Sequence, residues 1–133
     1  VHDVLTVLRY ASEHDPLARV TLVGLGPVAG PLVAAARAQV DEPVRAAVDT
    51  AGFRFESVER FDDPMFLPGA VKYLDLPALV ALGAGGELWL AGEGDAPPEL
   101  VARAHDVDAA GRLTVHAGVA DAGSAVDWLT RGR

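Results

Sequence analysis

The feature that most constrains the fold is an apolar run followed at once by glycines and then by a helix-forming segment. Residues 19–31 read RVTLVGLGPVAGP. Residues 20–23 have the composition of a short strand, and Gly24 and Gly26 supply the turn that follows it. Strand, glycine turn and helix form the first half of a β-α-β unit, which belongs to a parallel sheet. Such a turn lies at the carboxyl end of its strand, where open α/β sheets bind ligands.

The rest of the chain alternates short apolar runs with helical segments. We predict further strands at residues 44–48, 87–91 and 113–116. We predict helices at residues 2–14, 27–40, 77–82, 98–105 and 124–130, with Gly132 ending the last one. The 133 residues predict a single domain. The order of the elements predicts an α/β fold with a four-stranded parallel sheet, in the order 1-2-3-4, and helices on both of its faces.

A long segment separates the second and third predicted strands. Residues 53–61 alternate aromatic and charged side chains, which is typical either of a short extended piece or of an ordered loop. Residues 62–69, DDPMFLPG, combine turn residues with three large apolar side chains. Burial of one such side chain contributes about 1.5–3 kcal/mol. We therefore expect this loop to pack over the end of the sheet, with Phe66 and Leu67 substantially buried.

Charge and composition argue against several classes of partner. The formal net charge of −8 opposes binding to nucleic acid and to anionic membrane surfaces. No apolar run approaches the ~20 residues that a membrane span needs. The absence of cysteine removes disulfides, thiolate metal sites and cysteine nucleophiles, and leaves the cellular compartment undecided. Because the chain begins with Val1 instead of methionine, we expect a processed or trimmed product.

Four stretches of the sequence carry a resemblance to a known enzyme fold. They are VTLVGLGPVAGP, DTAGFRFESV, DDPMFLPGAVKY and LWLAGEGD. They resemble the carboxyl-terminal half of the α/β-hydrolase superfamily, and in particular the degenerate second domain of bacterial acetyl xylan esterase-like proteins, which are distantly similar to dienelactone hydrolases. The resemblance covers most of the chain and implies a partial α/β-hydrolase fold. The four strands would correspond to strands five to eight of that fold.

The resemblance also implies where catalytic residues would lie. An α/β-hydrolase carries its nucleophile in a G-x-S-x-G turn after strand five, and Gly26 stands where the serine would be. The acid that follows strand seven is best matched by Asp95, and the histidine that follows strand eight by His116. Simpler interpretations are a turn aspartate for Asp95 and a histidine bonded to backbone for His116. The resemblance therefore implies a relative that has lost its serine nucleophile.

Two function classes follow from these residues. One is a structural or assembly domain that descends from a hydrolase. The other is an ester or lactone hydrolase, acting on a small-molecule ester, in which His116, Asp95 and Asp121 work around a water or a cation. These three residues fall at strand ends on one rim of the predicted sheet.

A third class is a small-molecule or anion-binding module. The backbone N–H groups of Gly24, Leu25 and Gly26 would open a helix, and helix N-termini bind anions. The third glycine, Gly30, comes one place too late for the G-x-G-x-x-G fingerprint of dinucleotide-binding proteins, although Asp49 lies near the expected distance for their acidic residue. We therefore interpret the glycines as turn and packing residues and predict no cofactor. We also predict that Gly24 or Gly26 has a backbone conformation that other residues adopt poorly.

The acidic residues provide oxygen ligands without a recognisable metal-binding pattern. Five carboxylates near predicted loops could gather around a hard cation: Asp62, Asp63, Glu93, Asp95 and Asp121. Their spacing is not that of an EF-hand, and the four histidines do not have the spacing of zinc ligands. The acidic surface of a protein with net charge −8 explains these carboxylates, and we predict no metal site.

The first predicted strand favours self-assembly. In a complete hydrolase sheet an earlier strand flanks the strand that leads into the nucleophile turn, and that earlier strand is missing here. Residues 20–23 would then form an exposed edge, guarded only by Arg19 at one end. Two copies that pair antiparallel across a two-fold axis would form one eight-stranded sheet, so we predict a homodimer through the first strand. In the competing outcome the helix at residues 2–14 folds over the edge and the chain stays monomeric.

Overall fold

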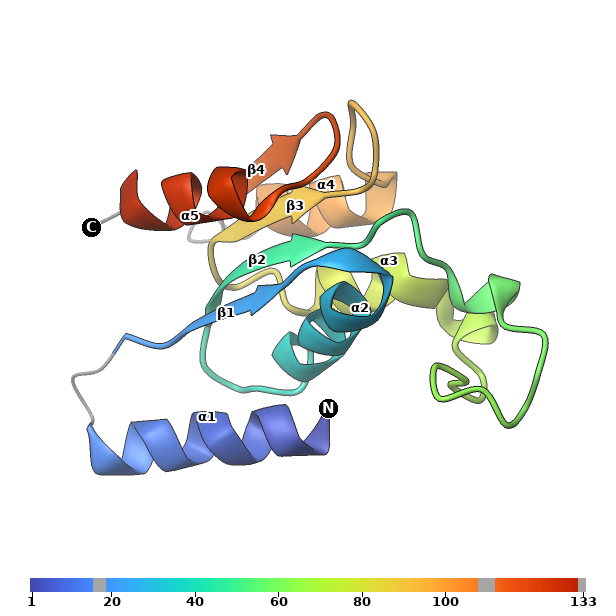
Figure 1. Cartoon of the computed structure of the whole chain (residues 1–133), viewed down its shortest axis with the longest axis horizontal. Helices are drawn as coiled ribbons and strands as arrows, with labels where there is room; N and C mark the ends of the chain where they lie inside the picture. The colour runs from blue at the N-terminus through green and yellow to red at the C-terminus, as the bar shows by residue number, and fades with distance from the viewer. Residues whose placement is uncertain (16–18, 108–111, 132–133) are drawn as a thin grey trace.

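Four short parallel strands form the centre of the fold (Figure 1). The computed structural model describes residues 1–15, 19–107 and 112–131. The strands are β1 (Thr21–Gly24), β2 (Arg45–Asp49), β3 (Leu88–Ala91) and β4 (Leu113–His116). The helices are α1 (His2–His14), α2 (Gly26–Arg37), α3 (Asp75–Leu82), α4 (Glu99–Val107) and α5 (Ala122–Arg131). Two short 3-10 turns, η1 (Phe55–Ser57) and η2 (Val71–Tyr73), lie between β2 and α3.

Each strand pairs in parallel with the next strand in the sequence. The sheet order is β1-β2-β3-β4, as predicted. The register places Leu22 opposite Ala46, Val48 opposite Leu90, and Leu90 opposite Val115. The observed bounds of the elements differ from the predicted ones by a few residues at most. Gly132, the predicted end of the last helix, lies outside the described residues.

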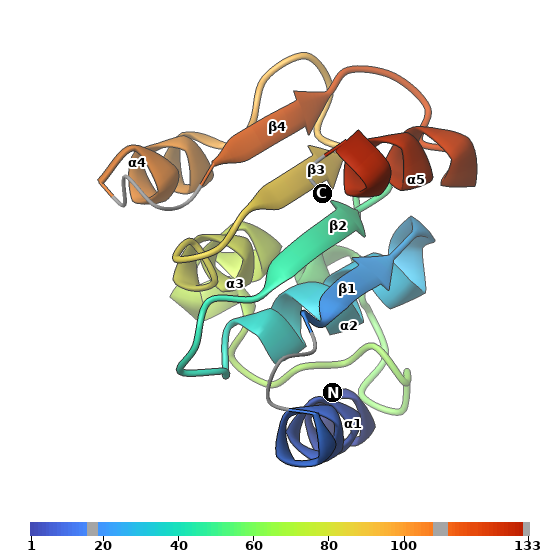
Figure 2. The same ribbon diagram turned by 90° about the vertical axis from the view of Figure 1, so that its left-hand side faces the viewer.

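Alternate residues of the central strands face two separate apolar cores. Residues 46 and 48 of β2 and 88 and 90 of β3 pack against α2, α3 and α4, which contribute Val33, Leu76, Val80 and Val101 among others. Residues 47, 89 and 91 face the other way and pack against Ala125 of α5. Right-handed crossovers in the order 1-2-3-4 bring all the connecting helices to one face, and α5 covers the other. Figure 2 shows α3 and α4 on one side of the sheet and α5 on the opposite side, so the prediction of helices on both faces is confirmed.

Helix α1 lies beyond β1, at the edge of the sheet opposite β4 (Figures 1 and 2). It packs against α2, and its Leu8 is buried. A partner strand that paired with β1 would have to share this edge with α1. The homodimer through the first strand stays a prediction. None of the helices within the described ranges is both long and apolar enough to span a membrane.

A buried arginine ties α2 to the starts of two strands. The Arg37 side chain donates from Nε to the carbonyl oxygen of Val44 at 2.9 Å and from Nη2 to that of Gly86. Burial lowers the pKa of Arg37 to about 10, because the surroundings solvate a charge less well than water does. The guanidinium thereby satisfies carbonyl groups at the amino end of the sheet, opposite the end where a ligand site is expected.

The loop at residues 62–69 does not cover the sheet. Phe66 and Leu67 are each 43% exposed, so the prediction that they are substantially buried was wrong. The space against the core is taken instead by Phe55, which is buried, and by Phe53, whose ring meets that of Phe55 edge to face at 5.1 Å. The preceding segment, residues 53–61, is therefore an ordered loop that contains η1, and its two phenylalanines pack into and against the core.

Candidate functional site

The turn between β1 and α2 is a sharp strand-to-helix elbow. Gly26 has a φ of 85°, which confirms the prediction that a glycine of this turn adopts a conformation poor for other residues. A Cβ added to Gly26 would meet no atom within 4 Å. A Cβ on Gly24 would lie 2.3 Å from the carbonyl oxygen of Ala29, and one on Gly30 would lie 1.9 Å from that of Asp49. Glycine at 24 and 30 therefore allows close packing, whereas glycine at 26 relieves backbone strain beside open space.

The carboxylate of Asp49 occupies the amino-terminal end of α2. Asp49 ends β2 and is buried. Its Oδ2 accepts a hydrogen bond from the N–H of Gly26 at 3.1 Å, and its Oδ1 accepts one from the N–H of Ala51 at 2.9 Å. A negative charge is favourable at this end of a helix. The residues predicted to bind an anion, Gly24, Leu25 and Gly26, therefore lie beside a carboxylate of the chain itself, which repels a second anion.

An ion pair with little exposure joins the loops that follow β2 and β3. Arg54 donates to both carboxylate oxygens of Glu93, from Nη1 to Oε1 at 3.0 Å and from Nη2 to Oε2 at 2.5 Å. The hydroxyl of Thr50 donates to Oε1 of Glu93 at 2.6 Å. The hydrogen bond with Glu93 raises the pKa of Arg54, so Arg54 remains a cation. The polar groups at this part of the rim therefore bind one another.

The two loops also approach each other closely through their backbones. Gly92 has a φ of 86°, and a Cβ on it would lie 2.3 Å from the backbone nitrogen of Ala51. Ala51 itself has a φ of 48°, a left-handed conformation that costs a non-glycine residue free energy. The strained turns and the ion pair together close the space between the carboxyl ends of β2 and β3.

His116 and Asp121 lie near each other at the other edge of the sheet. The ring of His116 packs on Trp89 with 5.0 Å between ring centroids, and its Nε2 is 3.4 Å from the carbonyl oxygen of Val119. Asp121 caps α5, because its Oδ1 accepts from the N–H of Ser124 at 2.7 Å and its Oδ2 from the Ser124 hydroxyl at 3.2 Å. These bonds, with a smaller effect of His116, hold the pKa of Asp121 below its ordinary value. The structure thus gives both residues local roles in the β4–α5 connection.

Asp95 and Gly26 lie on loops that follow two other strands, β3 and β1. Asp95 is exposed on the loop between β3 and α4. Gly26 follows β1 and His116 ends β4. Three spacings of about 4.8 Å between neighbouring strands, roughly 14 Å, separate the two positions across the sheet. Gly26 and His116 therefore do not meet in one site, and the catalytic set of His116, Asp95 and Asp121 stays a prediction.

Sequence reasoning missed part of the polar network at the rim. It considered Asp49 and Glu93 only as ligand-binding groups and did not consider Thr50 or Arg54. The available signal was that carboxylates directly end or closely follow two neighbouring strands, with an arginine in the intervening loop. In the described part of the chain, no group of three histidine, aspartate or glutamate side chains could hold a metal ion.

The strand order bears on where a ligand could bind. In open α/β sheets, ligands bind at the point where the strand order reverses, because the loops there separate into a crevice. The order β1-β2-β3-β4 has no reversal among the described strands. Comparisons with protein-family models, with curated proteins and with solved structures gave no match to this chain. The resemblance to the α/β-hydrolases therefore stays a prediction.

Proposed function

We propose that this chain is an α/β-hydrolase-like domain that has lost its serine nucleophile and serves a structural or assembly role. The observation that carries the proposal is Gly26. It lies at the apex of the elbow with a φ of 85°, has no side chain, and donates its N–H to Asp49. The nucleophile elbow of a hydrolase presents a side chain at this position, and a glycine cannot replace it.

The hydroxyl groups of the serines support the same proposal. The chain has three serines, Ser12, Ser57 and Ser124. Each hydroxyl donates to a nearby group: the carbonyl oxygen of Leu8, that of Arg54, and the carboxylate of Asp121, respectively. A nucleophilic serine needs a base within hydrogen-bond reach of its hydroxyl. Asp121 is the only carboxylate among these acceptors, and it caps a helix.

The network at the strand ends points in the same direction. Asp49, Thr50, Arg54 and Glu93 satisfy one another and neighbouring N–H groups. A catalytic rim needs polar groups that face a substrate, whereas these groups hold two loops together. Their arrangement favours a stabilising function for this part of the fold.

An ester-hydrolysis assay tests the proposal. Turnover of p-nitrophenyl acetate and butyrate should be measured for the wild type, His116→Ala and Gly26→Ser, each with and without Mg²⁺ or Zn²⁺. We expect all three proteins to match the buffer blank. The serine at 26 has open space but no histidine beside it, because His116 is roughly 14 Å away across the sheet. Turnover by the wild type that His116→Ala abolishes would contradict the proposal.

That contrary outcome would identify the second candidate function, an ester or lactone hydrolase with an unconventional site. The observation that favours this candidate is the electrostatic interaction between His116 and Asp121, which contributes to the lowered pKa of the Asp121 carboxyl. A histidine beside a carboxylate is able to act as a general base. Turnover that is equal in the wild type and in His116→Ala would instead come from a contaminating esterase, which a mock purification would reveal.

A further inference from the structure

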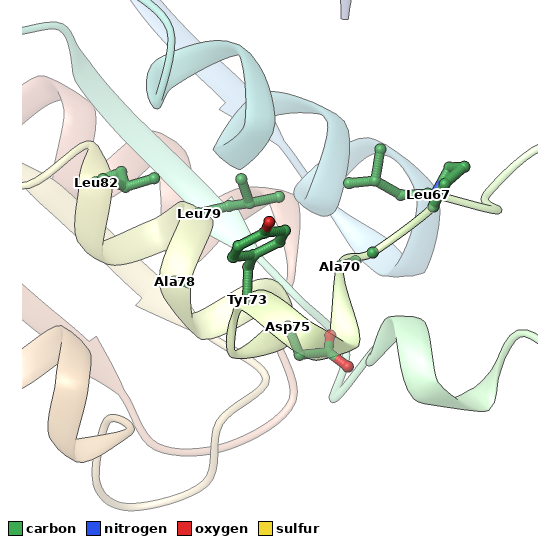
Figure 3. A pocket seen from close by; sticks show the side chains of 9 residues that line it. Leu67, Ala70, Tyr73, Asp75, Ala78, Leu79 and Leu82 are labelled. Atoms are coloured by element: carbon green, nitrogen blue, oxygen red, sulfur yellow. The ribbon is translucent and has the colours of Figure 1, made fainter.

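Two hollows in the described part of the chain differ in the charged groups that line them. The first has a volume of about 190 Å³ and lies beside α3, with the ring of Tyr73 across it (Figure 3). Asp75 is the charged residue that lines it, and its carboxylate accepts hydrogen bonds from three backbone N–H groups. These bonds hold a strained turn, in which Leu74 and Asp75 have φ values of 69° and 59°. Asp75 therefore stabilises the fold, and this hollow has no other charged side chain that would select a ligand.

The second hollow lies at the amino end of the sheet and has a volume of about 150 Å³. Its walls are the connection from α2 to β2 and the turn that follows α3, and they include Arg37, Asp41, Glu42 and Gly83. A cavity of this volume has room for roughly five water molecules. It is therefore too small for a drug-sized ligand and suits a molecule of a few non-hydrogen atoms.

Arg37 is a buried cation at this hollow. It is 3% exposed, and its Nε and Nη2 donate to the carbonyl oxygens of Val44 and Gly86. A guanidinium has five N–H donors, so these two bonds leave the donors of Nη1 and one donor of Nη2. Burial lowers the pKa of Arg37 to about 10, and no carboxylate of the described residues counteracts this shift. A buried charge without a partner of opposite sign is costly, and an anionic group in the hollow would offset that cost.

Gly83 leaves the guanidinium open to the hollow. A Cβ on Gly83 would lie 2.9 Å from Cγ and 3.2 Å from Nη1 of Arg37, so Nη1 lies next to this part of the wall. Gly83 has a φ of −87°, which residues with side chains also adopt. The glycine is therefore not needed for its backbone conformation, and what it provides is space beside Arg37.

Asp41 and Glu42 give the same hollow two negative groups. Both are exposed on the connection from α2 to β2. Neither contributes to the pKa of Arg37, so their carboxylates do not neutralise its guanidinium. The hollow thus combines one buried positive group with two exposed negative groups. A simple anion meets attraction and repulsion there, whereas a ligand with a charge of each sign is complementary to both.

We propose that this hollow binds a small zwitterion of the α-amino acid class. The carboxylate of the ligand accepts from the remaining N–H groups of Arg37, whose planar arrangement matches two carboxylate oxygens. The ammonium group of the ligand lies beside Asp41 and Glu42. The small volume selects glycine or alanine over amino acids with long side chains. This binding site lies at the end of the sheet opposite Gly26, so it goes beyond the proposed function and is independent of the missing nucleophile.

Nuclear magnetic resonance with ¹⁵N-labelled protein tests the site, with glycine as the probe. The wild type should be titrated with glycine, acetate and methylammonium at neutral pH and constant ionic strength. We expect glycine to shift the Nε–H signal of Arg37 and the backbone N–H signals of Gly83 and Gly85, with a Kd of about 1–10 mM. Acetate and methylammonium each lack one of the two charged groups, so each should bind about tenfold more weakly or not at all.

Two variants separate the roles of the charged groups. The double variant Asp41→Asn/Glu42→Gln should bind glycine about tenfold more weakly but acetate more tightly, because it removes the partner of the ammonium group and the repulsion of the anion together. Glu56→Gln/Glu59→Gln is the matched control, since it removes two exposed carboxylates that do not line the hollow. It should bind both ligands like the wild type. These four positions are exposed, and circular dichroism should show that both variants unfold like the wild type.

Four results would overturn the inference. They are no saturable shift of the Arg37 Nε–H signal up to about 50 mM glycine, acetate that binds as tightly as glycine, a double variant at Asp41 and Glu42 that binds glycine more tightly, and an equal loss of glycine binding in the control variant. The second result would indicate a site for simple anions, and the third would show that the acidic groups only repel. Ester turnover would overturn only the proposed function, since it leaves glycine binding at Arg37 unchanged.

Discussion

Replacing glycines of the elbow by alanine measures how closely α2 lies against the sheet. At Gly30 the new Cβ would lie 1.9 Å from the carbonyl oxygen and 2.7 Å from the carbonyl carbon of Asp49. Both are backbone atoms, so relief requires α2 to move away from β2 by more than 1 Å, which is our estimate from ordinary contact distances. That movement would separate Val33 and Ala34 from the core. Overpacking costs typically 1–3 kcal/mol, and we expect Gly30→Ala to lower the free energy of unfolding by about 3 kcal/mol.

The same substitution at Gly26 provides the matched control. No atom lies within 4 Å of the new Cβ, and only the φ of 85° opposes it. A left-handed alanine costs roughly 1–2 kcal/mol, and about 0.4–1 kcal/mol is offset because the unfolded chain loses conformational freedom. We therefore expect Gly26→Ala to lower the free energy of unfolding by about 1 kcal/mol, which is roughly a third of the decrease expected for Gly30→Ala.

Urea unfolding followed by tryptophan fluorescence compares the two variants. Trp89 is buried between the strands and α5, so its emission reports loss of the folded sheet. With a slope of about 1–3 kcal/mol per molar urea, a difference of about 2 kcal/mol shifts the midpoint by about 1 M. If Gly30→Ala unfolds at the same urea concentration as Gly26→Ala, α2 does not touch the end of β2, and the argument from close packing is refuted.

Three further outcomes are expected. Glu93→Ala should lower the free energy of unfolding by about 2–3 kcal/mol, because Arg54 and Thr50 lose their partner, and a Glu93→Gln variant as stable as the wild type would show that the charge contributes nothing. Asp121→Ala should lower the thermal midpoint above pH 3.8, the ordinary carboxyl pKa. This difference should shrink as the pH falls through the lower folded-state pKa, so a constant difference in circular dichroism melts down to about pH 2 would contradict the capping role. Light scattering behind size exclusion should give twice the monomer mass at micromolar concentration if β1 mediates the predicted homodimer, and a monomer mass from a cooperatively folded sample would reject it.

The strands and helices could be predicted because their signals are local. The apolar run at residues 113–116 and the helical spacing at residues 2–14 gave the observed bounds. The loop between β2 and α3 could not be predicted in this way, because Phe53 and Phe55 compete with Phe66 and Leu67 for the same kind of environment. The carboxylate of Asp75 fixes which segment packs inward, because it accepts a hydrogen bond from the N–H of Phe55, 20 positions earlier. No local pattern contains such a contact.

The polar contacts of the candidate site could not be predicted from local patterns either. The sharp turn at Gly26 could be inferred from the glycine pattern of the sequence. The contact of Arg54 with Glu93 spans 39 positions, and that of Gly26 with Asp49 spans 23. Both depend on which strands become neighbours and on how their loops are directed. The sequence therefore indicated the rim of the sheet correctly, but not that its polar groups bind one another.

The order of the strands has a consequence for how the chain folds. Each strand pairs with the strand that precedes it in the sequence, but the intervals differ. Leu22 and Ala46 lie 24 positions apart, and Leu90 and Val115 lie 25 apart, whereas Val48 and Leu90 lie 42 apart. Loop-closure entropy makes the long interval costlier by only about 0.5 kcal/mol, yet the segment within it includes the strained turn at Leu74 and Asp75. We expect β1-α2-β2 and β3-α4-β4 to form first as two local units, and their docking between β2 and β3 to complete folding.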